Sequence, residues 1–410
     1  MKPKLRFPEF TDDWEQRKLG DIGSTFTGLS GKTKEDFGHG EAKFITYLNI
    51  FNNVIADSEQ LESIEIDPKQ NEVKYGDIFF TTSSETPEEV GMSSIWLQNQ
   101  SNIYLNSFCF GYRLKIELDP YFMAFNLRSE SVRKKFIFLA QGISRYNISK
   151  NKVMEMEISL PCLTEQKKIG DFFSKLDSYI TLHQRKCDSL VKLQKALLQK
   201  MFPKNGESVP EVRFPGFTEP WEQRKLGEIG QCQSGVGFPD AEQGGTTGIP
   251  FFKVSDMNNP GNETEMVNAN NYVTEEQIAR KKWKPITEVP AMFFAKVGAA
   301  VLLNRKRLVS FPFLLDNNTM AYKFSSKWDA RFGKAVFETI YLPGLAQTGA
   351  LPSYNARDVE NISIFIPATK EEQVRIGGFF KTIDDTITLH QRKVQALQKL
   401  KKALLQQMFV

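Results

Sequence analysis

The chain has 410 residues and a net charge of +4, and at about 150 residues per domain this length predicts two or three domains. Hydrophobic residues make up 40% of the chain and charged residues 25%, which is typical of globular proteins and excludes a disordered chain. The longest nearly apolar run, residues 291–303, is interrupted by Lys296 and is shorter than the ~20 residues of a membrane-spanning helix. The first residues contain no apolar core of a signal peptide, so we expect a cytoplasmic protein without a membrane partner.

Cysteine and histidine are too scarce for the usual metal sites. Four cysteines lie far apart without a CxxC pair, and the chain has only three histidines. This pattern predicts neither a disulfide framework nor a zinc site, and histidine catalysis would depend on His39, His183 or His390. We therefore expect no metal site in this chain.

The chain consists of two consecutive copies of one pattern. Residues 5–23 and 212–230 share 14 of 19 positions at an offset of 207. Residues 169–202 and 376–409 share 22 of 34 positions at the same offset. A period this long indicates a duplicated domain rather than a solenoid of short repeats.

The segments between the matching blocks, about 24–157 and 231–361, have diverged strongly. Two pairs of short segments remain weakly similar: GDIFFTT (76–82) with AMFFAKV (291–297), and RYNIS (145–149) with SYNAR (353–357). Two similar frames with different inserts predict one architecture that performs two parallel recognition tasks.

Each insert is predicted to end in a strand, a proline and a long helix. Residues 154–160 alternate apolar and polar side chains, which is typical of a half-buried strand, and Pro161 ends it. In the second copy Pro367 has the same place, and Thr369 with Glu372 forms the pattern of a capping box at a helix start.

The helices that follow, 169–201 and 376–408, have apolar residues at alternating spacings of four and three over nearly five heptads, which predicts a coiled coil. The predicted seam between them comprises Phe173, Leu176, Ile180, His183, Leu190, Leu197, Phe380, Ile383, Ile387, His390, Leu397 and Leu404. Residues 203–216 are rich in proline and glycine and should turn the chain.

We expect the two helices to pack antiparallel about a pseudo-two-fold axis, with one globular insert at each end. The alternative is that each helix packs only on its own domain. His183 and His390 occupy matching seam positions and could form a polar pair that fixes the register, contact a partner, or pack their rings while the nitrogens reach water.

Paired variable regions between near-duplicate spacers, with a TEQ-type helix start, resemble the specificity subunit of type I restriction–modification systems. The RFPxF…WEQRKLG openings (6–20 and 213–227) and the ITLHQRK…KALLQ helices (180–199 and 387–406) are similar to that family's spacer regions, and the inserts are similar to its target recognition domains. The resemblance implies an α/β (α+β) protein with two globular target recognition domains related by pseudo-two-fold symmetry and separated by two long antiparallel coiled-coil helices. The implied segments are a first target recognition domain (1–161), a central spacer helix (162–202), a linker (203–211), a second target recognition domain (212–367) and a distal spacer helix (368–410).

The resemblance also implies the function. The chain would have no catalytic residue and no cofactor, and each target recognition domain would read one half of an asymmetric bipartite site in double-stranded DNA. Modification subunits that carry S-adenosylmethionine, expected to number two, would dock on the helices. Restriction subunits that use ATP and Mg²⁺ would join them.

The predicted dimensions agree with this function. A helix of 34 residues is ~51 Å long, and two reading domains on one side of B-DNA need centres ~34–36 Å apart. With half-sites of ~3–5 base pairs, that spacing leaves roughly 5–8 unread base pairs between them.

Side chains for base reading should lie on loops that reach the major groove, with Arg or Lys for guanine, Asn or Gln for adenine and Ser or Thr for either. The predicted DNA-contacting residues are Lys32, Lys34, Thr81, Thr82, Ser83, Ser144, Arg145, Tyr146, Asn147, Lys253, Lys296, Asn304, Arg305, Lys306, Arg307, Ser353, Tyr354 and Asn355. Alternatively, residues 304–307 form a solvated turn, and the two Tyr-Asn echoes are a shared structural turn with a buried tyrosine.

Other functions fit the sequence less well. GLSGKT (28–33) resembles the end of a phosphate-binding loop, but Phe26 stands where the first glycine is needed. Asp67, Glu72 and Lys74 resemble a loose nuclease triad, but the second copy has no equivalent. The main rival is a scaffold whose inserts bind proteins and not DNA.

Positive charge is concentrated in the predicted helices. Residues 165–202 carry eight Lys or Arg and four Asp or Glu, and residues 372–410 carry seven and three, so each helix has a charge of +4 and the remainder of the chain has −4. DNA affinity depends on neutralising phosphates. We therefore expect the isolated chain to bind DNA weakly, with partner subunits supplying most phosphate contacts.

Overall fold

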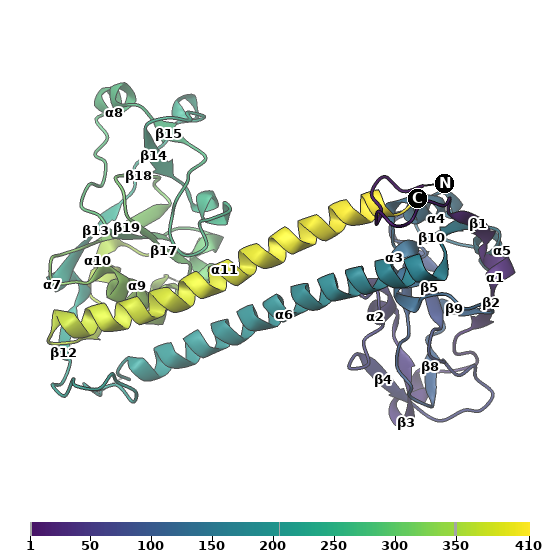
Figure 1. Cartoon of the computed structure of the whole chain (residues 1–410). Helices are drawn as coiled ribbons and strands as arrows, with labels where there is room; N and C mark the ends of the chain where they lie inside the picture. Colours follow the sequence, from purple (N-terminus) through teal and green to yellow (C-terminus); the bar gives the residue numbers. More distant parts are fainter. Residues whose placement is uncertain (1, 205, 348–350) are drawn as a thin grey trace. The chain divides into compact units, whose positions relative to one another are not determined.

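The structure is a computed structural model that describes residues 2–204, 206–347 and 351–410, and it divides into two compact units. The first unit comprises Met1–Leu182 with Lys393–Val410, and the second comprises His183–Arg392. Each unit combines antiparallel strand pairs with helices, which confirms the α+β prediction. The two longest helices, α6 (Leu163–Met201) and α11 (Lys370–Met408), contribute one part to each unit (Figure 1).

The first unit begins with the strands and helices of the first insert. They are β1 (Glu15–Lys18), α1 (Leu19–Ile22), β2 (Gly23–Thr27), η1 (Lys34–Asp36), β3 (Phe37–Ile45), α2 (Tyr47–Asn52), β4 (Leu61–Ile64), β5 (Ile78–Thr81), β6 (Ser83–Ser84), β7 (Ser93–Ile95), β8 (Ile103–Leu105), β9 (Cys109–Leu114), α3 (Pro120–Leu127), α4 (Glu130–Leu139), β10 (Tyr146–Asn147), α5 (Lys150–Met154) and β11 (Glu157–Leu160). The strand predicted over 154–160 is therefore wrong in its first half, because Met154 ends helix α5 and only 157–160 pair as a strand.

The second unit has a similar order of elements. Its elements are β12 (Glu222–Lys225), α7 (Leu226–Ile229), β13 (Gly230–Ser234), η2 (Asp240–Glu242), β14 (Ile249–Phe252), η3 (Val254–Asn258), β15 (Tyr272–Val273), α8 (Glu275–Lys281), β16 (Ala291–Ala295), η4 (Ala299–Leu303), β17 (Lys306–Val309), β18 (Leu314–Leu315), β19 (Thr319–Phe324), α9 (Ala330–Thr339), η5 (Leu342–Leu345), α10 (Ala356–Glu360) and β20 (Ser363–Ile366).

The sheets of the two units have the same topology although their sequences differ. A four-stranded antiparallel sheet has the order β2-β9-β5-β7 in the first unit and β13-β19-β16-β17 in the second. A three-stranded mixed sheet follows the same rule, with β4-β3-β8 matching β15-β14-β18. The repeated WEQRKLG segment forms β1 and β12, which pair with β11 and β20 directly before the long helices.

The opening segment of each copy fastens the start of the long helix. Arg6 donates from Nε and Nη2 to the two carboxylate oxygens of Glu165, at 2.7 Å each, and Trp14 Nε1 donates to Glu165 Oε1 at 3.4 Å. In the second unit Arg213 binds Glu372 in the same bidentate manner, and Trp221 donates to it. The shared Arg and Trp therefore hold a buried glutamate in the first turn of each helix.

The two helices run antiparallel within each unit. In the first unit Phe173 packs near Phe409, with ring centroids 5.6 Å apart, while Lys401 binds Asp177. Later residues of α6 thus meet earlier residues of α11. The alternative that each helix packs only on its own globular part is wrong.

The second unit repeats this packing. Gln194 Nε2 donates to Asp384 Oδ1 at 2.6 Å, and the Phe202 ring lies 6.1 Å from that of Phe380. His183 and His390 are hydrogen-bonded to each other through their Nδ1 atoms at 2.8 Å. All twelve predicted seam side chains are buried or half-buried in their units.

The end of each long helix completes a hydrophobic core. Phe409, directly after α11, contacts the rings of Trp14, Phe122 and Phe173 in the first unit. Phe202 has the same place in the second unit, against Trp221, Phe332 and Phe380. Each long helix therefore ends in the core of the unit that the other copy begins. Within the described residues, no helix is long and apolar enough to cross a membrane.

Candidate nucleic-acid interface

The central strand of each four-stranded sheet leads into a loop that carries predicted DNA-contacting residues. Phe79 and Phe80 in β5, and Phe293 and Phe294 in β16, are fully buried, so these strands are anchored in their cores. The sequence echo between the two Phe-Phe pairs thus marks equivalent strands. Their polar continuations leave the sheet at the same place in each unit.

In the first unit three segments meet at the end of β5, and we call residues 82–84, 106–108 and 144–148 the first junction. The amide of Thr82 donates to the carbonyl of Phe108 at 3.1 Å, and the carbonyl of Thr82 accepts from Ile148 at 3.0 Å. Ser83 and Ser84 of β6 pair with β10. The structure therefore brings together the TTSS and SRYN segments, which are about 60 residues apart in the sequence.

The second unit builds the same arrangement, and residues 296–298, 316–318 and 352–354 form the second junction. The amide of Lys296 donates to the carbonyl of Asn318 at 2.9 Å, and the carbonyl of Lys296 accepts from Tyr354 at 3.2 Å. A bridge joins Val297 to Ser353. These two backbone hydrogen bonds thus have the same partners in both junctions, with Thr82, Phe108 and Ile148 matching Lys296, Asn318 and Tyr354.

One turn gives each junction its rigidity. Asn106 Oδ1 accepts from the amide of Phe108 at 2.9 Å, and Asp316 Oδ1 accepts from the amide of Asn318 at 3.3 Å. A glycine lies against each turn, and a Cβ there would be 2.0 Å from the Asn106 carbonyl oxygen at Gly28 and 1.8 Å from that of Asp316 at Gly235. The first glycine of GLSGKT, Gly28, is therefore explained by the close approach of two backbone segments.

The exposed residues of the first junction are Ser107, Phe108, Ser144, Arg145 and Asn147. Phe108 is 60% exposed. Ile143, in the loop closed by the mutual hydrogen bonds of Gln141 and Asn147, is 96% exposed. Arg145 is exposed and donates from Nη2 to Ser83 Oγ at 3.0 Å. The first junction therefore offers one aromatic ring together with hydroxyl, amide and cationic groups.

The second junction offers amides and a lysine. Asn317 and Asn318 are exposed at the turn. Lys296 is half-buried, and burial lowers the pKa of its ammonium group. Asn355 follows the junction and caps α10, accepting from the amides of Arg357 and Asp358. These groups can donate hydrogen bonds to base edges or phosphates.

Some predicted DNA-contacting side chains are buried, and we leave them out of the candidate interface. Thr81 is inaccessible and its Oγ1 accepts from the amide of Met92. Tyr354 is 5% exposed and its hydroxyl donates to the carbonyl of Ala295. Ser83 is also buried, although its Oγ receives Arg145.

The two Tyr-Asn pairs, at 146–147 and 354–355, do not occupy equivalent positions in the junctions. The residue that matches Tyr354 in the junction is Ile148, whose amide makes the corresponding hydrogen bond. Tyr146 lies two residues earlier, in β10, and is half-buried. The interpretation of a shared turn with a buried tyrosine therefore holds for the second copy alone.

The basic cluster 304–307 serves the fold. Lys306 is 1% exposed, donates to the carbonyl of Ile340 at 2.9 Å, and burial lowers its pKa to about 8. Its neighbours are tied to nearby loops, since Asn304 donates to the carbonyl of Ile340, Arg305 to Asn258 Oδ1 and Arg307 to the carbonyl of Asn262. The interpretation of a solvated turn is therefore also wrong, because these side chains are half-buried or buried.

The other predicted lysines lie outside the junctions. Lys32 pairs with Asp67 at 2.8 Å, and this pair holds the pKa of the aspartate below its usual range. Lys34 is exposed in η1, and Lys253 is half-buried with Nζ 3.2 Å from Gln243 Oε1. Asp67, part of the loose nuclease pattern, is thus occupied by a structural ion pair.

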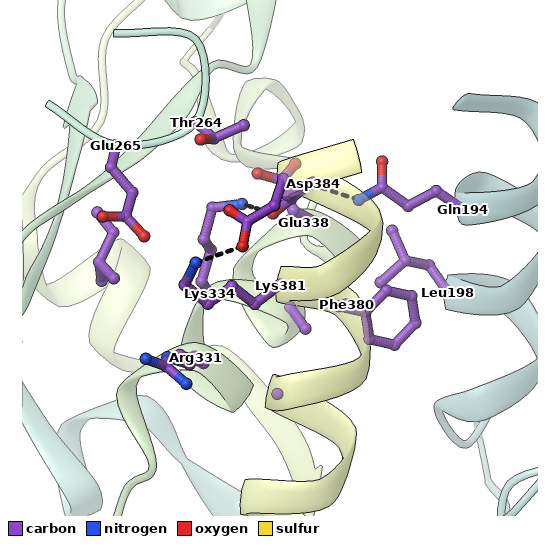
Figure 2. Close-up of a pocket in the computed structure, with 14 residues that line it drawn as sticks. Gln194, Leu198, Thr264, Glu265, Arg331, Lys334, Glu338, Phe380, Lys381 and Asp384 are labelled. Atoms are coloured by element: carbon purple, nitrogen blue, oxygen red, sulfur yellow. Dashed lines mark hydrogen bonds and ion pairs between the residues drawn. The ribbon is translucent and has the colours of Figure 1, made fainter. Parts of the chain in front are cut away.

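An enclosed cavity in the second unit lies away from the junction residues. Figure 2 shows Lys334 and Gln194 directed at Asp384, with Arg331 and Glu338 in the lining. The cavity measures about 20 Å³, roughly the space of one water molecule. Within residues 2–204, 206–347 and 351–410, no group of three or more His, Cys, Asp or Glu is placed to hold a metal ion.

Sequence reasoning missed the turn residues Ser107, Phe108, Asn317 and Asn318. They follow the short strands β8 and β18, and the segments LNS (105–107) and LDN (315–317) have the composition of turns. That composition could have indicated a turn. It could not show that the turns meet the loops after β5 and β16.

The chain is similar to proteins of one family. The model of the type I restriction modification DNA specificity domain matches residues 11–192 and 218–399. A putative type I restriction enzyme MjaX specificity subunit from Methanocaldococcus jannaschii is 26% identical over 98% of this chain and 94% of the relative. The type I restriction enzyme MjaIX specificity subunit of the same organism is 22% identical over 96% of this chain and 92% of the relative.

Solved structures share the fold. The crystal structure of a type I restriction–modification S subunit from M. genitalium has a TM-score of 0.66 and 16% identity, covering 100% of this chain and 99% of that chain. A chain from a structure of type I restriction–modification complex assembly has a TM-score of 0.56 and 17% identity, with 97% of each chain covered.

Proposed function

The chain belongs to the type I restriction modification DNA specificity family, and from this premise we propose that it directs a modification complex to an asymmetric bipartite DNA sequence. Each unit reads one half-site in double-stranded DNA through its junction. The two halves differ because the two junctions present different side chains.

One observation carries this proposal. The two junctions share backbone hydrogen bonds but not side chains, with the exposed Phe108 and half-buried Thr82 in one and the exposed Asn318 and half-buried Lys296 in the other. The matched turns thus combine a common backbone with different side chains. A duplicated reader needs a constant frame with variable contacts.

The helix pair sets the distance between half-sites and docks the modification subunits. Its outward side carries exposed basic residues from each helix: Arg185, Lys186, Lys192, Arg392, Lys393 and Lys399. Such residues contribute little to the seam and suit acidic partner surfaces or the phosphates of the DNA spacer.

The chemistry belongs to the partners. Modification subunits supply S-adenosylmethionine and methyl transfer, and restriction subunits supply the ATP- and Mg²⁺-dependent steps. The chain itself is a non-catalytic specificity subunit. Because its charge outside the helices sums to −4, the isolated chain binds DNA weakly, and a tight, salt-resistant complex of this chain alone with its duplex would contradict this part.

Base-resolution methylation sequencing tests the function. Cells expressing the matching modification subunits are compared with and without this chain. A new bipartite motif that appears only with the chain is the expected result. Exchanging residues 24–157 for the insert of another family member should change one half of the motif and leave the other half unchanged.

A negative result has a defined meaning. If the chain forms a stable complex with the modification subunits but no new motif is methylated, it acts as a protein-interaction scaffold, and the DNA-reading proposal is withdrawn. If insert exchange alters both halves together, the assignment of one junction to each half-site is wrong.

A further inference from the structure

Phe108 and Asn318 occupy the same point of the two junctions. Each is the third residue of a turn whose first residue accepts its amide, and each carbonyl accepts the amide of the residue directly after the central strand. The backbone at this point is therefore held from both sides. Its side chain can vary without cost to the frame.

The two side chains differ in kind and do not serve the core. Phe108 is 60% exposed and follows the exposed Ser107, so its ring has no place in the hydrophobic cores of the first unit. Asn318 is exposed, and its Nδ2 lies 3.5 Å from Asp316 Oδ2, the outer limit of a hydrogen bond. A large exposed aromatic group in a rigid turn gains nothing in stability there.

Other exposed or half-buried side chains lie near Phe108 and Asn318. Ile143, which is 96% exposed, directly precedes the 144–148 segment of the first junction. Asn317 and Lys296 add a further amide and a cation at the second junction. Both junctions thus expose polar groups, and they differ at the matched turn position, which holds an aromatic ring in the first and an amide in the second.

Base edges in the major groove of DNA offer a suitable partner for each of these two side chains. Thymine presents a C5-methyl group, which apolar side chains contact, and adenine presents N7 and N6–H₂, which asparagine binds with two hydrogen bonds. We propose that Phe108 and Asn318 are specificity-determining residues, with Phe108 contacting a thymine methyl group in one half-site and Asn318 binding an adenine in the other. This inference rests on the proposed function.

Base analogues test each contact in the complete modification complex. Duplexes carry the methylated motif with single thymines replaced by uracil, which lacks only the methyl group, or single adenines replaced by 7-deazaadenine, which lacks N7. The rate of methyl transfer at limiting DNA is compared for the natural chain, Phe108→Ala and Asn318→Ala. Ile116→Ala and Ser326→Ala, exposed beyond the opposite ends of β9 and β19, are the matched controls.

The expected pattern is reciprocal. With the natural chain, uracil at one thymine lowers the rate about fourfold, the effect of one methyl group. Deazaadenine at one adenine of the other half-site lowers it at least about fivefold. Phe108→Ala abolishes the thymine–uracil difference and keeps the adenine effect, Asn318→Ala does the reverse, and each control keeps both.

Several results overturn the inference. It fails if uracil has no effect at any thymine, if the half-site affected by Phe108→Ala contains no thymine, or if the analogue effects persist in the variants. Even if a variant does not fold, the absence of any analogue effect with the natural chain overturns the inference. Absence of any methylated motif refutes the proposed function itself, and is thus distinguished from failure of these two contacts.

Discussion

The glutamate at the start of α6 is the sharpest test of how this fold is held together. Glu165 is inaccessible to solvent, and its two oxygens accept from Arg6 at 2.7 Å each, while Oε1 also receives the indole of Trp14. Glu165→Gln keeps the size of the side chain but removes its charge. It also places an amide N–H₂ opposite an Arg6 donor.

The cost follows from the burial of this pair. The Arg6 side chain is 12% exposed, so its charge remains largely desolvated after the substitution. Removing one partner of a buried ion pair costs about 3–5 kcal/mol. Because Arg6 can turn partly toward water, we expect the lower end, about 3 kcal/mol.

Hydrogen exchange with urea titration measures this loss, since it reports the opening free energy of the first turn of α6 separately from the rest. Glu372→Gln should produce an equal loss at the start of α11, where Arg213 makes the same bidentate contact. Asp171→Asn removes an exposed ion pair with Lys175 and should leave the free energy of unfolding nearly unchanged. If Glu165→Gln costs no more than Asp171→Asn, the glutamate does not fasten the helix and the argument is refuted.

Three further substitutions test the cores and the junction frame. Burial lowers the pKa of Lys306 from 10.5 to about 8, so between these pH values the unfolded chain binds more protons and the free energy of unfolding rises with pH. Lys306→Met should remove this rise, which is at most about 1.4 kcal/mol per pH unit. Urea unfolding at pH 8 and 9.5 measures it, and a pH dependence equal to that of the natural chain would contradict the prediction. Phe409→Ala should cost about 3–5 kcal/mol in chemical denaturation, because its ring lies against three aromatic rings of the first unit, and a loss below about 1 kcal/mol would mean that the chain end is not part of that core. Tyr354→Phe should lower the free energy of unfolding by about 1–3 kcal/mol, because the buried carbonyl of Ala295 loses its donor. Tyr146→Phe should be nearly neutral. Equal losses would mean that the two tyrosines have equivalent roles, as the similar Tyr-Asn sequences suggested.

The long helices were predictable because their pattern is local. Apolar residues at spacings of three and four define a helix face within the segment itself, and the offset of 207 repeats that face. Helices α6 and α11 lie inside the ranges expected for the spacer helices, and their seam residues are buried or half-buried.

The role of the opening segments could have been predicted but was not. Arg6 and Glu165 are 159 residues apart, and Arg213 and Glu372 have the same separation. The duplication therefore contained the pairing twice. Assigning Glu372 to a capping box used only the local pattern and overlooked a partner in the opening segment.

The candidate interface was predictable only in part. The TTSS and SRYN segments were singled out by composition, and the structure brings them together. Burial removed Thr81, Lys306 and Tyr354, since a basic or hydroxyl side chain near a strand end can face the core as well as solvent. Phe108 was missed because an exposed aromatic residue has no distinguishing sequence pattern.

The sequence alone determined the duplication, the antiparallel helix seam and the divergence of two inserts on a common frame, because these depend on periodicity and self-similarity. The tertiary structure decided which loops meet, which basic residues are buried and which core each helix end completes. Strand pairing between segments far apart in the chain depends on backbone hydrogen bonds that any sequence of suitable shape can make. That is why two inserts with little sequence in common form the same junction and expose different side chains on it.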